Sequence, residues 1–329
     1  MKKFIAMILS LVMTLSLAAC GSSAPAATEA PAAETFKVAI IQQLDHSSLD
    51  EIRTAIETQL KALAAEKGIS IEISYDNGQN DTSMLTQIAT QVVADKVDMI
   101  IPIATLAAQY SVLAAENTGI PVVYAAISDP EGAGLTGLST VTGVSDALNT
   151  PFILDMMLAA QPDVKTVGLL YSTSEVNSEA PIAEAKAYLD AKGIAYLEKT
   201  GTTSGEIVEA AASLVGRVEA VFTPTDNVVM AAEASVAELL NADGIAHYTG
   251  ADSFVQSGAF TTCGVNYTEL GTKVGDMAFE ILNGGAIGEF VVMDGGIITV
   301  NTDTAAAIGV DYEVFNTMAN TLVTVTTAE

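Results

Sequence analysis

The sequence predicts an α/β protein with two similar halves, each built around a parallel sheet and joined by a hinge. Short runs rich in Ile and Val recur along the chain, and stretches with apolar residues at helical spacing lie between them. Most of these runs lack polar alternation, so both faces of the expected strands should be buried. Strand–helix–strand order at this rhythm is typical of βαβ units. The length of 329 residues fits two domains at roughly 100–200 residues each.

The first half contains four of these expected strands, with helices between them. The strands are residues 36–43, 69–75, 97–104 and 120–126, and the helices are residues 50–68, 84–96 and 106–119. Two of the helical stretches end at a glycine, Gly68 and Gly119. Glycine is the common residue just past a helix C-terminus, so these positions support the assignment.

The same pattern begins again after Asp146. The expected strands are residues 165–172, 194–200, 218–225 and 245–250, with helices near 175–192, 204–214 and 227–241. Further elements follow at residues 260–267, 269–285, 290–293 and 296–300. Elements beyond two similar halves indicate that the chain crosses between the lobes more than once. We therefore expect an N-terminal lobe of residues 36–146 plus 252–286 and a C-terminal lobe of residues 147–251 plus 287–329, which close about a hinge.

The first 35 residues have the features of a targeting segment followed by a tether. Two lysines and an apolar run precede Leu17-Ala18-Ala19-Cys20, which resembles the lipobox of bacterial lipoprotein signals. An ordinary cleaved signal peptide with a chance cysteine is the alternative. We expect residues 1–19 to be the signal peptide and residues 20–35 to be a lipidated, flexible tether. Cys20 would then hold the protein at the outer face of a membrane, in a periplasm or at the cell surface.

Composition excludes several classes of protein. The 13 Lys and Arg residues against 40 Asp and Glu give a formal charge of -27, which repels nucleic acid and anionic lipid headgroups. Two cysteines cannot build a disulfide framework or a zinc cage.

An enzyme is not predicted either, and no cofactor or metal is expected. The sequence has no P-loop, no dinucleotide-binding motif and no nucleophile elbow. His46 and His247 lie in different halves; His46 is more typical of a polar loop and His247 of the core or a sheet surface. Cys263 lies in an apolar run, which indicates a buried thiol rather than a nucleophile.

Polar residues follow several of the expected strands in both halves, at positions where helices begin. In open α/β sheets, ligands bind beyond the carboxyl ends of the strands. Backbone N–H groups at helix N-termini suit a ligand carboxylate, and acidic side chains in the same cleft suit an ammonium group. The pattern therefore predicts a site for a zwitterion, although the same residue types are also ordinary N-caps and turn residues. The candidates are Leu44, Asp45, Asn77, Thr105, Ser128, Asp129, Tyr171, Glu175, Asn177, Ser178, Asp226, Asn227 and Asp252.

Several motifs, in order over about 270 residues, carry a resemblance to a known family. They include DHSSLDEIRTAIETQL, ISDPEGAGL, VTGVSD, VGLLYSTSEVNS, FTPTDNVV and YTELGTKVGDMAFEILNGG. From about Lys37 to Gly309 the chain resembles the substrate-binding lipoproteins of ABC importers, and more narrowly those that bind tryptophan, tyrosine or another aromatic amino acid. The resemblance implies a type I periplasmic-binding-protein fold with three crossovers between lobes. It also implies a permease and its ATPase as partners of a monomeric binding protein.

The resemblance also implies roles for individual residues in the cleft. We expect Asp226 to bind the ligand ammonium group, with Glu175 as the second choice. Thr105, Ser128 and nearby backbone N–H groups are expected to bind the carboxylate.

Two further positions concern the ligand side chain. Tyr171 and Leu44 are expected to line an aromatic pocket. Asn77 is a departure, because this chain reads Asp76-Asn77-Gly78 where the family often has Asn-Ala. The tail after Val310 has no assigned role. A nucleoside or an aliphatic amino acid is the alternative ligand, and a receptor component that passes a signal to a membrane sensor is the alternative function.

Overall fold

The computed structural model describes residues 35–328, which belong to one compact unit. The expected signal peptide, the lipidation site Cys20 and all but the last residue of the expected tether lie outside the described residues. Within residues 35–328, no helix combines the length and the apolar character that a membrane span requires.

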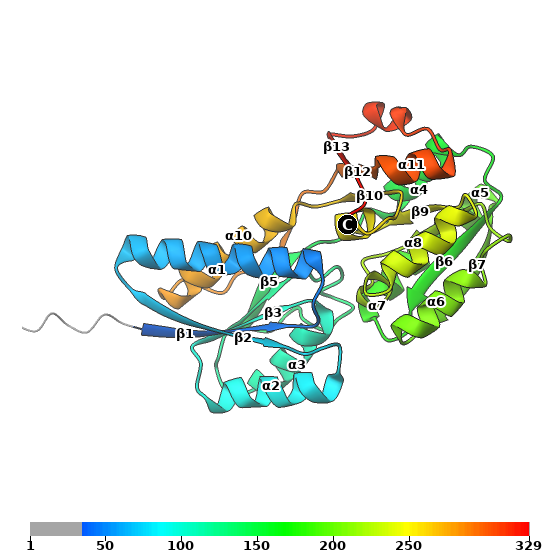
Figure 1. The fold of residues 1–329 in the computed structure, drawn as a ribbon. Helices are drawn as coiled ribbons and strands as arrows, with labels where there is room; N and C mark the ends of the chain where they lie inside the picture. Colours follow the sequence, from blue (N-terminus) through cyan, green and yellow to red (C-terminus); the bar gives the residue numbers. More distant parts are fainter. Residues whose placement is uncertain (1–34, 329) are drawn as a thin grey trace, which may run out of the picture. The chain divides into compact units, whose positions relative to one another are not determined.

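The first lobe is built on a six-stranded parallel sheet with helices on both faces. The strand order is β11-β5-β4-β3-β1-β2. In Figure 1, α1 and α10 cover one face, and α2 and α3 cover the other. The strands are β1 (Thr35–Gln42), β2 (Ser70–Asn77), β3 (Met99–Ile103), β4 (Val122–Ala125), β5 (Val141–Ser145) and β11 (Val291–Val292). The helices are α1 (Ser47–Lys67), α2 (Thr82–Ala94), α3 (Thr105–Ala115) and α10 (Tyr267–Leu282).

The second lobe is built on a seven-stranded sheet in the order β13-β12-β10-β9-β8-β6-β7, in which only the β10–β12 pair is antiparallel. Helices α4 and α5 pack against one face, and α6 and α8 against the other. The strands are β6 (Thr166–Ser172), β7 (Ala195–Gly201), β8 (Ala220–Thr223), β9 (Ala246–Thr249), β10 (Thr261–Gly264), β12 (Ile297–Asn301) and β13 (Thr321–Val325). The helices are α4 (Thr150–Ala160), η1 (Val176–Ser178), α5 (Glu179–Lys192), α6 (Ser204–Ala212), α7 (Asn227–Met230), α8 (Glu233–Ala242), α9 (Asp252–Gln256), α11 (Thr302–Ile308) and η2 (Glu313–Thr317).

Burial explains which of the expected strands are apolar throughout. All residues of β3, β4, β8 and β9 are buried, because helices cover both faces of these central strands. The expectation of two buried faces is wrong for β2 and β7, which lie at sheet edges and are mostly exposed or half-buried. An edge strand has a neighbour on one side only, so it tolerates polar side chains.

The chain passes between the two sheets three times within the described residues, after β5, after β10 and after β11. The expected two-lobed α/β fold with three crossovers is thus confirmed. The lobe boundaries differ from those expected at two places. Strand β10, expected in the first lobe, extends the second sheet by pairing with β9, and β11, expected in the second lobe, pairs with β5 of the first. Residues 265–286 belong to the first lobe because α10 packs along α1.

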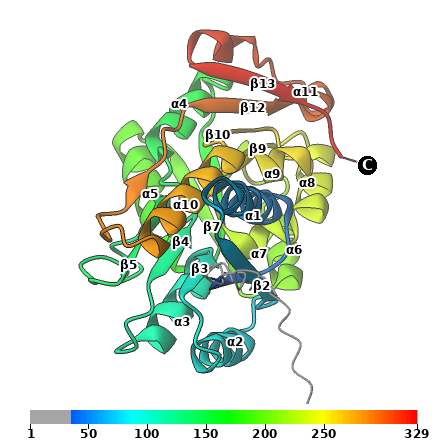
Figure 2. The ribbon, with the colours of Figure 1, turned by 90° about the vertical axis from the view of Figure 1, so that its left-hand side faces the viewer.

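The tail after Val310 completes the second lobe. Strand β13 pairs in parallel with β12 and forms the edge of the sheet, as Figure 2 shows. Phe315 in η2 is fully buried, and its ring lies 6.0 Å from that of Phe260. The tail is therefore part of the hydrophobic core.

Candidate functional site

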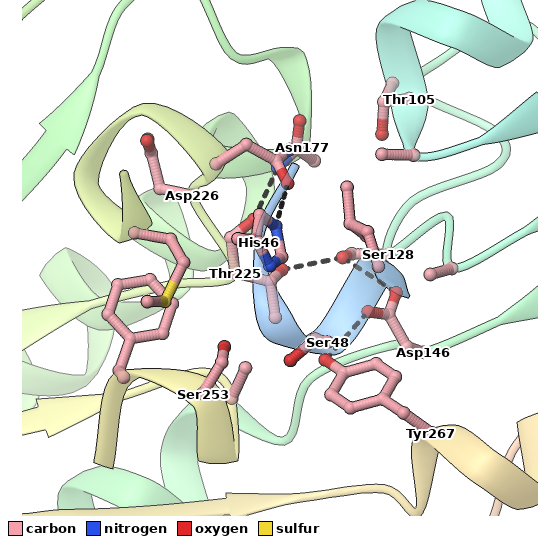
Figure 3. A pocket seen from close by; sticks show the side chains of 17 residues that line it. His46, Ser48, Thr105, Ser128, Asp146, Asn177, Thr225, Asp226, Ser253 and Tyr267 are labelled. Atoms are coloured by element: carbon pink, nitrogen blue, oxygen red, sulfur yellow. Dashed lines mark hydrogen bonds between the residues drawn. The ribbon is translucent and has the colours of Figure 1, made fainter. Parts of the chain in front are cut away.

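A cavity lies where the carboxyl ends of strands from both sheets meet. It contains about 380 Å³ of space unfilled by protein atoms, part of it open to solvent. Only about 30 Å³ of this space is accessible to the centre of a water-sized sphere, so the lobes must move apart to admit a small molecule to the cavity. Figure 3 shows polar side chains from both lobes around it. Its polar side chains are His46, Ser48, Thr105, Ser128 and Asp146 from the first lobe, Tyr267 from α10, and Asn177, Thr225, Asp226, Asn227 and Ser253 from the second.

Hydrogen bonds between side chains hold the two lobes together across this cavity. Gln43 Nε2 of the first lobe donates to Glu175 Oε1 of the second at 2.7 Å. His46 Nε2 lies 3.1 Å from Asn227 Oδ1. The hydroxyl groups of Ser128 and Thr225 lie 2.7 Å apart. The structure is therefore the closed form of a two-lobed cleft.

Asp146 is a buried carboxylate in the cavity wall. It directly follows β5, at the first crossover, and is 6% exposed. Its Oδ1 accepts from Ser128 Oγ at 3.0 Å and its Oδ2 from Tyr267 OH at 3.4 Å (Figure 3). Burial raises the pKa of Asp146, and the bonds from Ser128 and Tyr267 partly oppose that shift. Sequence reasoning missed this residue as a site candidate, although it closes the quoted motif VTGVSD.

Asp226 also lines the cavity, but its carboxylate is already occupied. It is the N-cap of α7, and its Oδ1 accepts from the backbone N–H groups of Val228 and Val229. Its Oδ2 accepts from the backbone N–H of Ser172 at 2.6 Å and from Ser178 Oγ at 2.7 Å. Four accepted bonds use the capacity of a carboxylate. This geometry favours the capping role over contact with a ligand.

Glu175 is buried behind the cavity wall with an exposure of 1%. It accepts from Gln43 of the other lobe and, through Oε2, from Asn227 Nδ2 at 2.7 Å. Burial, and next the charge of Asp226, raise the pKa of Glu175 to about 8. This carboxyl group joins the lobes and does not face the ligand space.

His46 lies in the cavity rather than in a solvated loop, contrary to the sequence-based expectation. It stands between β1 and α1, and its Nδ1 makes no hydrogen bond to a described residue. Burial lowers the pKa of His46, so the ring is neutral at pH 7. Asn177 Oδ1 and Ser253 Oγ are likewise buried without a partner among the described residues. Such atoms are costly to bury unpaired, and a bound ligand is one way to satisfy them.

The cavity is also bordered by two helix N-termini and by strained backbone. The N-cap residues of α1 and α3 provide no side-chain cap, and in α3 the side chain of Gln43 accepts from the backbone N–H of Leu106 through Oε1 at 3.0 Å. Ala104 and Ala126 follow β3 and β4 with φ of 73° and 56°, and both line the cavity. Non-glycine residues rarely adopt positive φ, and such strain is common at ligand sites. The backbone at the ends of β3 and β4 therefore adopts a strained conformation where it lines the cavity.

The structure brings together only part of the predicted site. Thr105, Ser128, Asn177, Asp226 and Asn227 line the cavity. The remaining predicted site residues lie outside the cavity lining, where most of them make other contacts. Leu44 is core; Asp45 accepts from Tyr75; Asn77 and Asp129 accept backbone N–H groups in turns; Tyr171 donates to Glu198; Ser178 donates to Asp226; and Asp252 lies in the first turn of α9.

His247 and Cys263, considered for catalysis together with His46, are buried away from the cavity. His247 bonds to Glu233 and Thr223, and all three are fully buried. Burial raises the pKa of Cys263 to about 11, so its thiol is protonated at pH 7. In the part of the chain that the structure describes, no group of three or more His, Cys, Asp and Glu side chains is arranged to hold a metal ion.

Two lobes, three crossovers and a cavity between strand ends are the features of the type I periplasmic-binding-protein fold. The family model for ABC transporter substrate-binding proteins matches residues 37–318, and the chain belongs to that family. A tyrosine-binding protein of Clostridioides difficile is 33% identical over 278 residues, which are 82% of this chain and 80% of the relative.

Two solved structures, one with a ligand and one without, match this conformation to different degrees. The domain of a Streptococcus pneumoniae ABC protein in complex with L-Trp is 29% identical, with a TM-score of 0.81 over 88% of this chain and all of the other. A ligand-free, open substrate-binding protein with adhesive properties from Clostridium difficile is 32% identical, but its TM-score is 0.67 over 89% of this chain and all of the other. The higher similarity to the complex is consistent with lobes that are joined across the cavity.

Proposed function

We propose that this protein is the extracytoplasmic solute-binding lipoprotein of an ABC importer, and that its ligand is an aromatic amino acid. The observation that supports this most directly is a cavity lined by Asp146, a carboxylate with remaining acceptor capacity, and by the first turns of α1 and α3, a combination that suits a zwitterion. The relatives named for tyrosine and solved with L-Trp support the aromatic class.

The ammonium group of the ligand is assigned to Asp146 rather than to Asp226. Asp146 has two protein donors and retains acceptor capacity, whereas Asp226 has four. An ammonium ion beside Asp146 offsets the burial of its charge. Neutral acceptors stand nearby, at Asn177 Oδ1 and Ser253 Oγ.

The carboxylate of the ligand is assigned to the helix N-termini. Ser48 and Leu49 in the first turn of α1 and Thr105 at the start of α3 line the cavity. Uncapped N–H groups at the positive end of a helix stabilise an anion. The cavity lining contains no lysine or arginine, so these groups are its main source of positive potential.

The side chain of the ligand is assigned to the apolar part of the lining. Leu49, Met230, Phe254 and the ring of Tyr267 supply it. Apolar and aromatic walls with few polar groups favour a large hydrophobic side chain.

The test is calorimetric titration with L-tryptophan, L-tyrosine, L-phenylalanine, L-leucine and a nucleoside. The protein is first unfolded and refolded to remove co-purified ligand. We expect micromolar or tighter binding of an aromatic amino acid. Because the chain has no Trp, fluorescence excited at a Trp-selective wavelength reports only added tryptophan. Binding of the nucleoside alone, or of no amino acid, would contradict the proposed ligand.

Membrane attachment and delivery of the ligand involve residues outside the described range and other protein chains. Cys20 is the proposed lipidation site, and residues 1–19 and 20–35 are the proposed signal peptide and tether. A monomer in its closed form is proposed to deliver ligand to a permease served by an ATPase. Catalysis has no part in this function.

A further inference from the structure

Two of the hydrogen bonds that join the lobes are linked through one carboxyl group. Glu175 Oε1 accepts from Gln43 Nε2 of the first lobe, and Glu175 Oε2 accepts from Asn227 Nδ2, both at 2.7 Å. Asn227 Oδ1 in turn lies 3.1 Å from His46 Nε2 of the first lobe. The four side chains form a continuous chain that leaves the first lobe at Gln43 and returns to it at His46.

The closed cleft buries Glu175 without a cation. The side chain is 1% exposed, and among the described residues no lysine or arginine forms an ion pair with it. Asp226 nearby is fully buried and adds a like charge. Removing a carboxylate from water beside another carboxylate favours its neutral form.

We propose that Glu175 is the latch of this cleft, and that closure of the lobes draws one proton from solvent onto its carboxyl group. When the lobes separate, Gln43 and His46 leave with the first lobe, and Glu175 returns to water beside Asn227. The carboxyl group then ionises, and the proton goes back to solvent. Glu175 does not line the cavity, so it acts as a positioning residue. This inference deepens the proposed function, whose ligands serve as probes below.

The direction of the pH dependence follows from the two states. In the closed form the pKa of Glu175 is raised from 4.5 to about 8, by burial and then by Asp226. In water the group has its ordinary pKa. Between these values the closed form binds one proton more than the open form, so closure weakens as pH rises through this window. Above about pH 8 both forms are ionised and the dependence ends.

The contacts also determine which oxygen carries the proton. Gln43 Oε1 accepts from the backbone N–H of Leu106 at 3.0 Å, so Gln43 Nε2 faces Glu175, and Oε1 of Glu175 stays an acceptor. The proton is therefore on Oε2, which faces Asn227. In the structure Asn227 Nδ2 donates to Oε2, so protonation of Oε2 requires the Asn227 amide to turn end for end; Asn227 Oδ1 then accepts the proton and Nδ2 donates to His46 Nε2. His46 then carries its own proton on Nδ1 and offers the ligand a donor instead of an acceptor.

Other acidic side chains near this network differ from Glu175 in their hydrogen-bond partners, their location or the pH range in which they titrate. Burial also raises the pKa of Asp226, but its four hydrogen-bond partners all belong to its own lobe, so opening does not remove them. Asp146 bonds to Ser128 and Tyr267 and lies on the far side of the cavity. The pKa of Asp252 is raised to about 6, by burial and then by the charge of Glu51. The other acidic side chains that face His46 are Asp45 and Asp50.

The test is the number of protons taken up when L-tyrosine or L-tryptophan binds. Titrations at pH 7 in two buffers with different ionisation enthalpies give this number for the wild-type protein, without any variant. We expect a net uptake of more than half a proton per ligand, because closure buries His46 and lowers its pKa, so that this ring releases a fraction of a proton. For the same reason we expect the affinity to fall roughly tenfold between pH 6 and pH 8. Identical heats in the two buffers would overturn the proposal.

Two variants assign the proton. Glu175→Gln keeps an acceptor for Gln43 and supplies a permanent donor to Asn227, so it resembles the protonated form. We expect it to bind without net proton uptake, and its affinity should not fall from pH 6 to pH 8. Asp252→Asn removes the other raised carboxyl near the interface and should leave uptake at pH 7.5 unchanged. Uptake that persists in Glu175→Gln, or that is lost in Asp252→Asn, would overturn the assignment to Glu175.

A ligand-free measurement separates this inference from the proposed ligand. Small-angle scattering of the wild-type protein from pH 5 to pH 9 reports the balance of open and closed forms. We expect the radius of gyration to increase as pH rises towards 8. If no amino acid binds but the radius of gyration still increases with pH, the proposed ligand is wrong and the role of Glu175 in closure is supported. A radius that does not change, together with proton-free binding, would refute the latch.

Discussion

The carboxyl group of Asp146 lies between Ser128 and Tyr267, where the chain first leaves the first lobe. These two donors hold the carboxylate in place without using its full acceptor capacity. At the scale of single residues, this makes Asp146 the side chain on which binding of a ligand ammonium group depends most.

Replacing this carboxylate tests the assignment. Asp146→Asn removes the charge but keeps an acceptor for Ser128. We expect amino-acid affinity to fall by about 2 kcal/mol or more, because a buried ammonium ion loses its counter-charge. Calorimetric titration measures the loss.

Asp129 provides the matched control. Its Oδ1 accepts from the backbone N–H of Gly132 in a turn, and it does not line the cavity. Asp129→Asn keeps that acceptor and should leave affinity unchanged. Equal losses in the two variants, or none in Asp146→Asn, would contradict the assignment.

Local roles were predictable from sequence, and long-range partners were not. Asp226 was weighed as an N-cap because a cap depends on residues two or three positions away, and it is one. Glu175 was expected near a ligand, but its partner Gln43 lies 132 residues earlier in the chain. No pattern near Glu175 contains that contact. Asp146 was missed for the same reason, since its burial arises from the meeting of β5 and α10.

At the scale of elements, the sequence predicts strands whose residues are apolar throughout, but it does not reveal strands whose apolar run is broken by polar or small residues. Strand β5 has the sequence VTGVS, so polar and small residues break its apolar run. Gly143 is required there, because a Cβ atom at this position would lie 2.2 Å from the backbone oxygen of Tyr124. Strand β13 was missed because its edge position leaves it mostly exposed, without the burial pattern of a central strand.

The C-terminal elements are expected to stabilise the second lobe. Phe315→Ala in η2 removes a fully buried ring that packs near Phe260. We expect the free energy of unfolding to fall by about 3–5 kcal/mol, the usual cost of such a cavity. Denaturant titration measures it.

Val323→Ala in β13 is the control, because that side chain is 40% exposed. Its effect should stay within about 0.5 kcal/mol. If Phe315→Ala were equally mild, the tail would not be part of the core as described.

At the scale of the whole molecule, attachment to a membrane is expected to depend on Cys20, the proposed lipidation site. Cys20→Ala should move the protein from the membrane to the soluble fraction after cell lysis, because one covalent lipid anchor is removed. Fractionation and immunoblotting measure this. The other cysteine, Cys263, supplies the control. It is buried in the second lobe, so Cys263→Ala should leave the distribution between membrane and soluble fractions unchanged. Membrane attachment that survives Cys20→Ala would contradict the lipoprotein proposal.

The three crossovers also set the order in which the chain folds as it is made. The first sheet lacks an edge strand until β11 emerges at residue 292, and the second lacks one until β13 emerges at residue 325. Neither lobe can therefore complete its sheet while most of the chain is still being synthesised. Pairings between distant segments form slowly, which prolongs the time that the chain remains unfolded. A translocation channel that accepts only unfolded chains would have that interval in which to take this one.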